Sequence, residues 1–469
     1  MTDAPHRPDT PDSGSTSAPP PPTTGLELRD GVRIPRRQIF SWALWDWGTQ
    51  PFNTVILTFV FTVGYLLTES FLDPELAALG EGDPARDRGL AELASGLGLW
   101  TTLAGVLVAL LAPVLGQRAD ASGRRKAWLG GATGGMVLCM LALWFVEADP
   151  AYFVFGAIVI GLGSVLSEIA GVNYNAMMVS VATPKTVGKV SGLGWGLGYV
   201  GGILVLVLVV IATGADWWGM PTDNGLSFRV IAVGCALWAL VFVWPIFAFV
   251  PELPPTKGRP KVGFFASYGV LYRDIKGLWR NARRTFWFLL ASAVFRDGLS
   301  GVFAFGAAIG TLSFGFSFDQ VVIFGIAANL VAGISTILVG RADDRFGPRS
   351  VILTTLSVIV VAGLAVVFLR DLGPVVYWVG GLILSACVGP AQAASRSYLA
   401  RVTPAGRESE IFGLYATTGR ATSWMSHGLW TILIAVTGAT IWGTLGIVAV
   451  VLLGLVLMWF VQEAPVADG

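Results

Sequence analysis

The chain has 469 residues, of which 54% are hydrophobic and 13% are charged, and its mean hydropathy is +0.68. These values exclude a soluble globular protein of this length, because so apolar a chain cannot cover its surface with groups that water solvates. The formal net charge of +1 says little, since charge in a membrane protein matters by side. The composition therefore predicts an integral membrane protein.

Apolar runs long enough to span a bilayer follow one another along the chain. At roughly 20 residues per span, they predict about twelve transmembrane helices, near residues 40–67, 91–115, 127–147, 151–178, 191–213, 228–250, 285–313, 319–339, 351–370, 375–400, 409–434 and 438–461. About 23 of the 31 Lys and Arg residues fall on the side of the amino terminus, and about four on the other side. This asymmetry predicts a multi-pass protein of the cell (plasma) membrane with both termini in the cytoplasm.

The two ends of the chain are polar. Residues 1–39 are rich in Pro, Ser, Thr and Asp and lack an apolar run, which predicts a disordered cytoplasmic tail and no signal peptide. Residues 463–469 are predicted to form a second, short cytoplasmic tail. Cys139, Cys235 and Cys387 fall within predicted spans without pairing or metal-ligand spacing, so we expect them to be packing residues.

One short motif occurs twice, about 224 residues apart, between pairs of apolar runs. Each copy has a Gly, an Asp four residues later, a Gly three residues beyond that, and arginines. This spacing predicts a tight turn whose carboxylate reaches a neighbouring helix end and whose arginines stay in the cytoplasm. We expect the motifs to gate the cytoplasmic side, through Gly116, Asp120, Gly123, Arg124 and Arg125 in the first copy and Gly340, Asp344, Arg345 and Gly347 in the second.

The repeat extends to other positions, since residues 183–184 (TP) recur at 403–404 and residues 192–193 (GL) recur at 413–414. Three matches at nearly one offset predict two six-helix bundles of common ancestry, at residues 40–250 and 285–462, with a substrate path between them. In the fifth span, Gly194, Gly198 and Gly202 form a strip of small residues where another helix can approach closely.

Residues 251–284, between the two halves, combine basic residues with an apolar stripe at helical spacing. The stripe contains Phe264, Tyr268, Leu271, Tyr272, Ile275, Leu278 and Trp279. This pattern predicts a cytoplasmic linker with an interfacial amphipathic helix, whose aromatic face lies in the lipid boundary. The alternative is an ordinary polar linker.

Few ionisable side chains lie inside the predicted spans, and most of them fall on polar edges of otherwise apolar helices. Because burial of a charge in lipid is costly, such residues point to a path or a site. The predicted substrate or coupling cavity contains Asp46, Gln50, Asn53, Glu168, Asn175, Arg296, Asp297, Gln392, Arg396, Arg420 and His427.

Several of the acidic residues also have a structural interpretation. Asp46 is as consistent with anchoring a helix end by pairing with an arginine as with function. Glu168 lies deeper and is expected to couple proton movement to conformational change. Arg296 and Asp297 are sequence neighbours and cannot face one another, so each needs a partner on another helix or a contact with substrate.

The remaining basic residues differ in depth. Arg420 lies near the middle of its span and is expected to contact a substrate carboxylate, whereas Arg396 lies nearer the cytoplasmic edge and suits a gate partner. His427 is expected to satisfy a local hydrogen bond, with a coupling role as the alternative.

The paired motifs resemble the signature of the major facilitator superfamily. Further strings resemble its vacuole-effluxer branch, whose bacterial members form the unknown major facilitator family: SWALWDWG at 41–48, NYNA at 173–176, VSGLGWGLGY at 190–199, SRS at 395–397 and FGLY at 412–415. The resemblance implies an all-α integral membrane fold of twelve helices in two pseudo-symmetric bundles. It also implies a secondary transporter that alternates access by rocking the bundles. Fungal relatives are linked to amino-acid efflux, so amino acids are the first substrate expected.

The sequence thus favours a transporter of a small polar solute, with an exporter of drugs or lipophilic compounds and a transporter-like sensor or receptor as alternatives. No enzyme is expected, because no nucleophile set or metal-ligand spacing occurs, and no ATP-driven pump, because no phosphate-binding loop occurs. We expect no cofactor, coupling to protons, and a monomer in the lipid bilayer that binds a small-molecule substrate and no nucleic acid.

Overall fold

The computed structural model describes residues 24–80, 83–219, 223–252 and 263–464, and these are helical apart from turns and one isolated bridge between Thr24 and Pro404. The α-helices are α1 (Arg36–Pro51), α2 (Pro74–Ala77), α3 (Pro84–Ser122), α4 (Arg125–Ala142), α5 (Phe153–Ala176), α6 (Met178–Val181), α7 (Val187–Gly214), α8 (Leu226–Phe249), α9 (Phe264–Asn281), α10 (Arg283–Phe314), α11 (Phe318–Phe346), α12 (Pro348–Phe368), α13 (Pro374–Val402), α14 (Glu408–Thr422), α15 (Met425–Thr437) and α16 (Thr440–Trp459).

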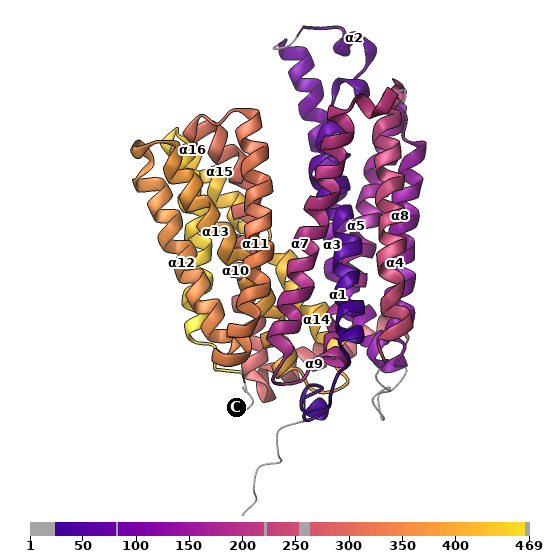
Figure 1. Ribbon diagram of the computed structural model, residues 1–469, viewed down its shortest axis with the longest axis vertical. Helices are drawn as coiled ribbons and strands as arrows, with labels where there is room; N and C mark the ends of the chain where they lie inside the picture. Colours follow the sequence, from indigo (N-terminus) through magenta and orange to yellow (C-terminus); the bar gives the residue numbers. More distant parts are fainter. Residues whose placement is uncertain (1–23, 81–82, 220–222, 253–262, 465–469) are drawn as a thin grey trace, which may run out of the picture.

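The long helices form two bundles that lie side by side (Figure 1). The first contains α1, α3, α4, α5, α7 and α8, and the second contains α10 to α16. The bundles meet through two crossed pairs, α3 with α14 and α7 with α11. They converge at the end where α9 lies, hereafter the α9 end, and diverge toward the opposite end (Figure 1).

Within the described residues, ten helices are long and apolar enough to cross a bilayer. Two further spans are interrupted rods. α1 ends at Pro51 and continues into π-helical segments, Phe52–Phe59 and Thr62–Leu66, because proline disturbs the regular hydrogen-bond ladder. The eleventh span breaks between α14 and α15. The two rods complete the twelve-helix fold that the sequence predicted.

The repeated motifs lie on helices and not, as predicted, in loops. α3 continues to Ser122, so Gly116 and Asp120 occupy its last turns, and only Gly123, with φ +64°, forms the turn. In the same way α11 continues to Phe346 and turns at Gly347. The helical backbone fixes the direction of each carboxylate, which a flexible loop would not do.

Glycines along α7 let two neighbours approach on different faces. A Cβ at Gly194, Gly198 or Gly202 would meet residues of the first span at 2.7, 3.4 and 2.5 Å, which confirms the predicted strip. On another face, a Cβ at Gly192 or Gly196 would meet α11 of the other bundle at 2.6 or 2.5 Å. α7 therefore packs tightly both within its own bundle and across the interface.

α9 lies across the end of the molecule where the two bundles converge (Figure 1). Its apolar stripe is only partly available to lipid. Leu271 and Leu278 are buried in the main core cluster, with Tyr268 packed against it, whereas Tyr272 and Trp279 are exposed. Much of the stripe predicted to lie in the lipid boundary therefore attaches α9 to the protein.

The prediction of disorder for residues 1–39 is wrong for the part that the structure describes, while residues 1–23 lie outside it. Leu26 is 1% exposed and belongs to the main core cluster. Arg29 donates to the Ser180 carbonyl of the first bundle at 2.8 Å, and Thr24 bridges Pro404 of the second. Residues 24–29, hereafter the strap, therefore contact both bundles.

Candidate functional site

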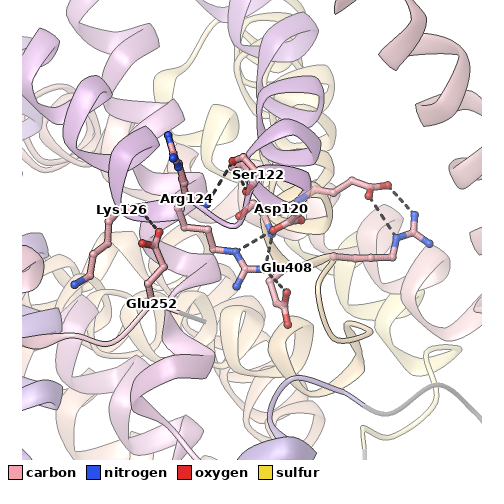
Figure 2. Close-up of polar contacts among 11 residues, drawn as sticks. Asp120, Ser122, Arg124, Lys126, Glu252 and Glu408 are labelled. Atoms are coloured by element: carbon pink, nitrogen blue, oxygen red, sulfur yellow. Dashed lines mark hydrogen bonds and ion pairs between the residues drawn. The ribbon is translucent and has the colours of Figure 1, made fainter. Parts of the chain in front are cut away.

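The first closure contact joins the end of α3 to the start of α14. The two Asp120 carboxylate oxygens accept hydrogen bonds from the backbone N–H groups of Ser409 and Glu410, at 3.1 and 2.9 Å. Arg125 donates to Asp120 at 2.7 Å and to Glu408 at 2.5 Å (Figure 2). The carboxylate thus binds the positive end of a helix in the other bundle, while one arginine pairs with both acids.

The second closure contact repeats the first by pseudo-symmetry. Asp344 at the end of α11 accepts hydrogen bonds from the backbone N–H groups of Gly188 and Lys189 at the start of α7, at 2.7 and 2.9 Å. Arg401 supplies the cation, 3.3 Å from Asp344 and 3.6 Å from Asp343. Each bundle therefore holds the amino-terminal end of one helix of the other.

The motif glycines are the points of closest approach in these crossings. A Cβ at Gly116 would lie 2.2 Å from the Ser409 carbonyl oxygen, and one at Gly340 would lie 2.8 Å from that of Gly188. The repeated Gly192 and Gly413 are reciprocal, since their Cβ atoms would meet the carbonyl oxygens of Thr336 and Ala112, each at 2.6 Å. The repeat in the sequence thus encodes a repeated interface.

The arginines of the motifs differ in position. Arg125 is buried in the first closure contact. Arg124, which directly precedes α4, is exposed, and its side chain makes no capping hydrogen bond to that helix (Figure 2). Arg345 is also exposed and lies 5.2 Å from the Phe346 ring. The sequence predicts that Asp120 and Asp344, with Arg124 and Arg345 nearby, hold the helix ends together. In this structure the arginines that pair with these two acids are Arg125 and Arg401.

A polar cavity of about 830 Å³, open solvent included, lies between the two bundles above the closure contacts. Eight of the predicted residues line it: Asp46, Gln50, Asn53, Glu168, Asn175, Arg296, Gln392 and Arg396. Aromatic side chains complete the wall, among them Trp45, Tyr174, Trp195, Phe412 and Tyr415. The lining comes from both bundles, and the volume of the cavity suits a small solute.

Arg396 ties the α9 side of the cavity together. It is 2% exposed and lies 3.5 Å from Asp46, and it donates to Asn175 at 2.9 Å and to the Ser191 carbonyl at 2.8 Å. Its guanidinium also lies 4.6 Å from the Trp195 ring centroid. Arg396 belongs to the second bundle and these partners to the first, so the side chain is a further cross-bundle contact.

Arg420 pairs with Glu168 across the bundles, at 2.5 Å, with 39% of each side chain exposed. Arg420 does not line the central cavity directly and instead borders a neighbouring hollow with Ser164. Two other described ion pairs cross between the bundles, Arg125–Glu408 and Arg396–Asp46, and their side chains are at most 13% exposed. The Glu168–Arg420 pair is therefore the most accessible of the three to water and solutes.

Besides Arg420, two predicted residues do not line the cavity. Asp297 is buried and accepts hydrogen bonds from the backbone N–H and the hydroxyl of Ser426, at 2.7 and 3.1 Å, so it caps the start of α15 after the break in the eleventh span. His427 packs beside Phe305, with ring centroids 4.9 Å apart. The prediction that these two residues line the cavity is wrong in this structure.

The sequence interpretation missed Glu408, Asp343 and Arg401. Glu408 and Arg401 have no counterpart in the repeat, since Val187 and Val181 occupy the matching positions of the first half. The available signals were positional: Asp343 precedes the motif Asp344 directly, and Arg401 and Glu408 flank the repeated residues 403–404.

The twelve helices in two bundles with a polar cavity between them have the fold of the major facilitator superfamily. Two solved structures share the fold: the human organic anion transporter MFSD10, at a TM-score of 0.69 and 19% identity over 90% of this chain and 99% of that one, and the proton:xylose symporter XylE, at 0.67 and 13% over 91% and 96%. These likenesses concern the fold alone.

The family described as "Vacuole effluxer Atg22 like" matches residues 92–465, and the chain belongs to that family. A similar protein is the uncharacterized MFS-type transporter YxiO of Bacillus subtilis (strain 168), 24% identical over 435 residues, which are 92% of this chain and 96% of YxiO.

Proposed function

We propose that the protein is a secondary transporter that moves a small polar solute, with amino acids as the first candidates. The observation that carries the proposal is the cavity itself, which combines carboxylates, guanidinium groups and amides from both bundles. Such a lining stabilises a solute that carries polar groups of both signs, and it would be costly to maintain in a membrane without a function.

Alternating access follows from the place of the cross-bundle contacts. The Asp120 and Asp344 contacts lie at the α9 end, and each joins a side chain to N–H groups at a helix start, which water can satisfy after separation. Rocking of the bundles would break them and open the cavity at that end. We infer that the α9 end faces the cytoplasm of a plasma-membrane protein, with both termini there, and that this conformation opens outward.

Ion coupling is assigned to the Glu168–Arg420 pair. Protonation of Glu168 would remove the charge that holds Arg420 across the interface, and water reaches both side chains. A proton could thus weaken one cross-bundle contact without disturbing the buried ones. The cavity is completed by one chain, which supports a monomer as the functional unit.

The test uses purified protein in liposomes. Uptake of radiolabelled amino acids is measured with and without an imposed proton gradient, against empty liposomes. We expect saturable uptake of at least one amino acid, raised by an inward proton gradient. Absence of flux for every amino acid under both conditions would exclude amino acids as substrates, and it would also exclude proton-coupled amino-acid transport.

A second candidate, export of lipophilic compounds, is supported by one observation. An apolar cavity of about 900 Å³, open solvent included, lies mainly within the second bundle and is lined by Phe303, Phe324 and Tyr377 among others. Thermal-shift measurements separate the candidates, because amino acids should stabilise the protein if the polar cavity is the site, and hydrophobic cations if the apolar one is.

A further inference from the structure

We propose that Arg296 is the anion-recognition residue of the cavity and that the transported solute carries a carboxylate. The inference rests on the proposed function, because it names the substrate class of that same cavity. It changes the expectation from sequence, in which Arg420 contacts the substrate carboxylate.

The charges around the cavity do not balance. Two carboxylates, Asp46 and Glu168, are committed to Arg396 and Arg420, at 3.5 and 2.5 Å. Arg296 lines the same cavity, and among the described residues no carboxylate forms an ion pair with it. The inventory is three cations against two anions, which leaves one positive charge for the solute to compensate.

Arg296 is held in place by groups that do not neutralise it. Its Nη1 donates to the Tyr415 carbonyl at 2.9 Å, and its guanidinium carbon lies 3.7 Å from the Tyr415 ring centroid. Gly419 lets the guanidinium lie against α14, since a Cβ there would come within 3.2 Å of Nη1. These contacts orient the plane of the guanidinium without neutralising its positive charge.

The other donors of Arg296 remain available. A guanidinium has five N–H donors, and the described structure commits one of its nitrogens, Nη1, to a hydrogen bond. None of its nitrogens is both buried and unpartnered, so the remaining donors are reached from the cavity. A planar fork with two parallel donors fits the two oxygens of a carboxylate.

Arg396 cannot take this role in the same conformation. It is 2% exposed, and its two Nη atoms already bind Asn175 and the Ser191 carbonyl. Arg420 would have to leave Glu168 to bind a solute anion. Arg296 alone among the three offers charge and open donors without first breaking an ion pair.

The test compares solutes with and without a carboxylate. Purified protein in liposomes is assayed for uptake of L-alanine against L-alaninamide, L-leucine against L-leucinamide, and L-lactate against glycerol. The variants are Arg296→Gln, which removes the charge, and Arg296→Lys, which keeps it without the planar fork. Arg229→Gln is the matched control, because Arg229 pairs with Glu147 near the start of α8, far from the cavity.

We expect the wild type to favour the carboxylate member of at least one pair. Arg296→Gln should lower the apparent affinity for that member at least about tenfold, as for a lost charged hydrogen bond. Arg296→Lys should retain part of it, and the control should match the wild type. Size-exclusion profiles and melting temperatures within those of the wild type establish that each variant is folded.

Two outcomes overturn the inference and leave transport intact: uptake of the two amides and glycerol as readily as of the carboxylates, or an unchanged preference in Arg296→Gln. Failure of the proposed function looks different, because then none of the six solutes moves through the wild type.

Discussion

Asp120 in α3 accepts a hydrogen bond from the backbone N–H of Glu410 at the start of α14, at 2.9 Å, and this bond joins the two bundles. The bond closes the α9 end without a partner side chain on α14. Because any residue supplies a backbone N–H, the contact depends on the acid and on the position of the helix end, and pseudo-symmetry reproduces it at Asp344.

Asp120→Asn should therefore open the α9 end. The amide loses the charge that pairs with Arg125, and it replaces one of the two acceptor oxygens by a donor. Asp120 and Arg125 belong to the same bundle, so the loss that falls on the closed arrangement is that of the charged hydrogen bonds to the N–H groups of Ser409 and Glu410. A hydrogen bond to a charged group is worth about 1.5–3 kcal/mol. Asp344→Asn should have the smaller effect, because the Asp344 side chain is 13% exposed whereas that of Asp120 is fully buried.

Spin labels at the exposed positions Arg124 and Arg345 report this opening by pulsed electron spin resonance, after the native cysteines are replaced by alanine. Both positions lie at the α9 end, one on each bundle, and neither belongs to a closure contact. Asp120→Asn should raise the fraction of long distances. Distances unchanged from the unmutated chain would contradict the gating role.

A double-mutant cycle tests the pair of Asp46 and Arg396. Arg396→Leu leaves the Asp46 carboxylate without its cation in the interface and should destabilise the protein by about 3–5 kcal/mol. This loss is measured as a lower melting temperature in detergent. Asp46→Asn combined with Arg396→Leu should recover part of the loss, because no uncompensated carboxylate remains. Additive effects of the two changes would show that the two charges do not interact.

The sequence predicted the fold more fully than the site. Hydropathy alone located the twelve spans, and the repeat predicted two bundles. The structure adds where they meet, because a Cβ at Gly192 or at its repeat Gly413 would lie 2.6 Å from a carbonyl oxygen of the opposite bundle. Hydropathy could not show the break between α14 and α15, so the role of Asp297 as a cap was invisible.

The sequence also could not predict which charged side chains form ion pairs between the bundles. The sequence placed Arg396 and Arg420 on the polar edges of their helices. A polar edge does not reveal whether the arginine on it already pairs with a carboxylate of the other bundle. The geometry between bundles decides that question, and it is what distinguishes Arg296 from the other two arginines. Local periodicity predicts exposure to a shared cavity and leaves the partners undetermined.

Glu168→Gln should separate exchange from accumulation. The amide mimics a protonated carboxyl, so the cross-bundle pair with Arg420 is permanently weakened and no proton is bound or released there. Exchange of an amino acid across the liposome membrane should continue, whereas uphill uptake under a proton gradient should fall at least about tenfold. Glu147→Gln, at an acid on the end opposite α9, is the matched control, and accumulation by Glu168→Gln equal to that control would refute coupling at this residue.

The strap offers a test of closure that leaves the motifs untouched. Leu26 is 1% exposed in the main core cluster, whereas Leu28, two residues along the same strap, is 65% exposed. Leu26→Asp replaces a buried apolar contact by a charge beside Glu408, whose Oε1 would lie 2.4 Å from a Cβ at Gly25. Loss of the leucine burial alone costs about 1.5–3 kcal/mol, and like charge adds to it.

Because the strap contacts Ser180 of one bundle and Pro404 of the other, its release should favour opening at the α9 end. The spin-label pair at Arg124 and Arg345 should show longer distances in Leu26→Asp than in Leu28→Asp, the matched control with the same added charge. If both variants shift the distances equally, the added charge is responsible and the strap does not hold the bundles. If neither does, the motif contacts close the α9 end without it.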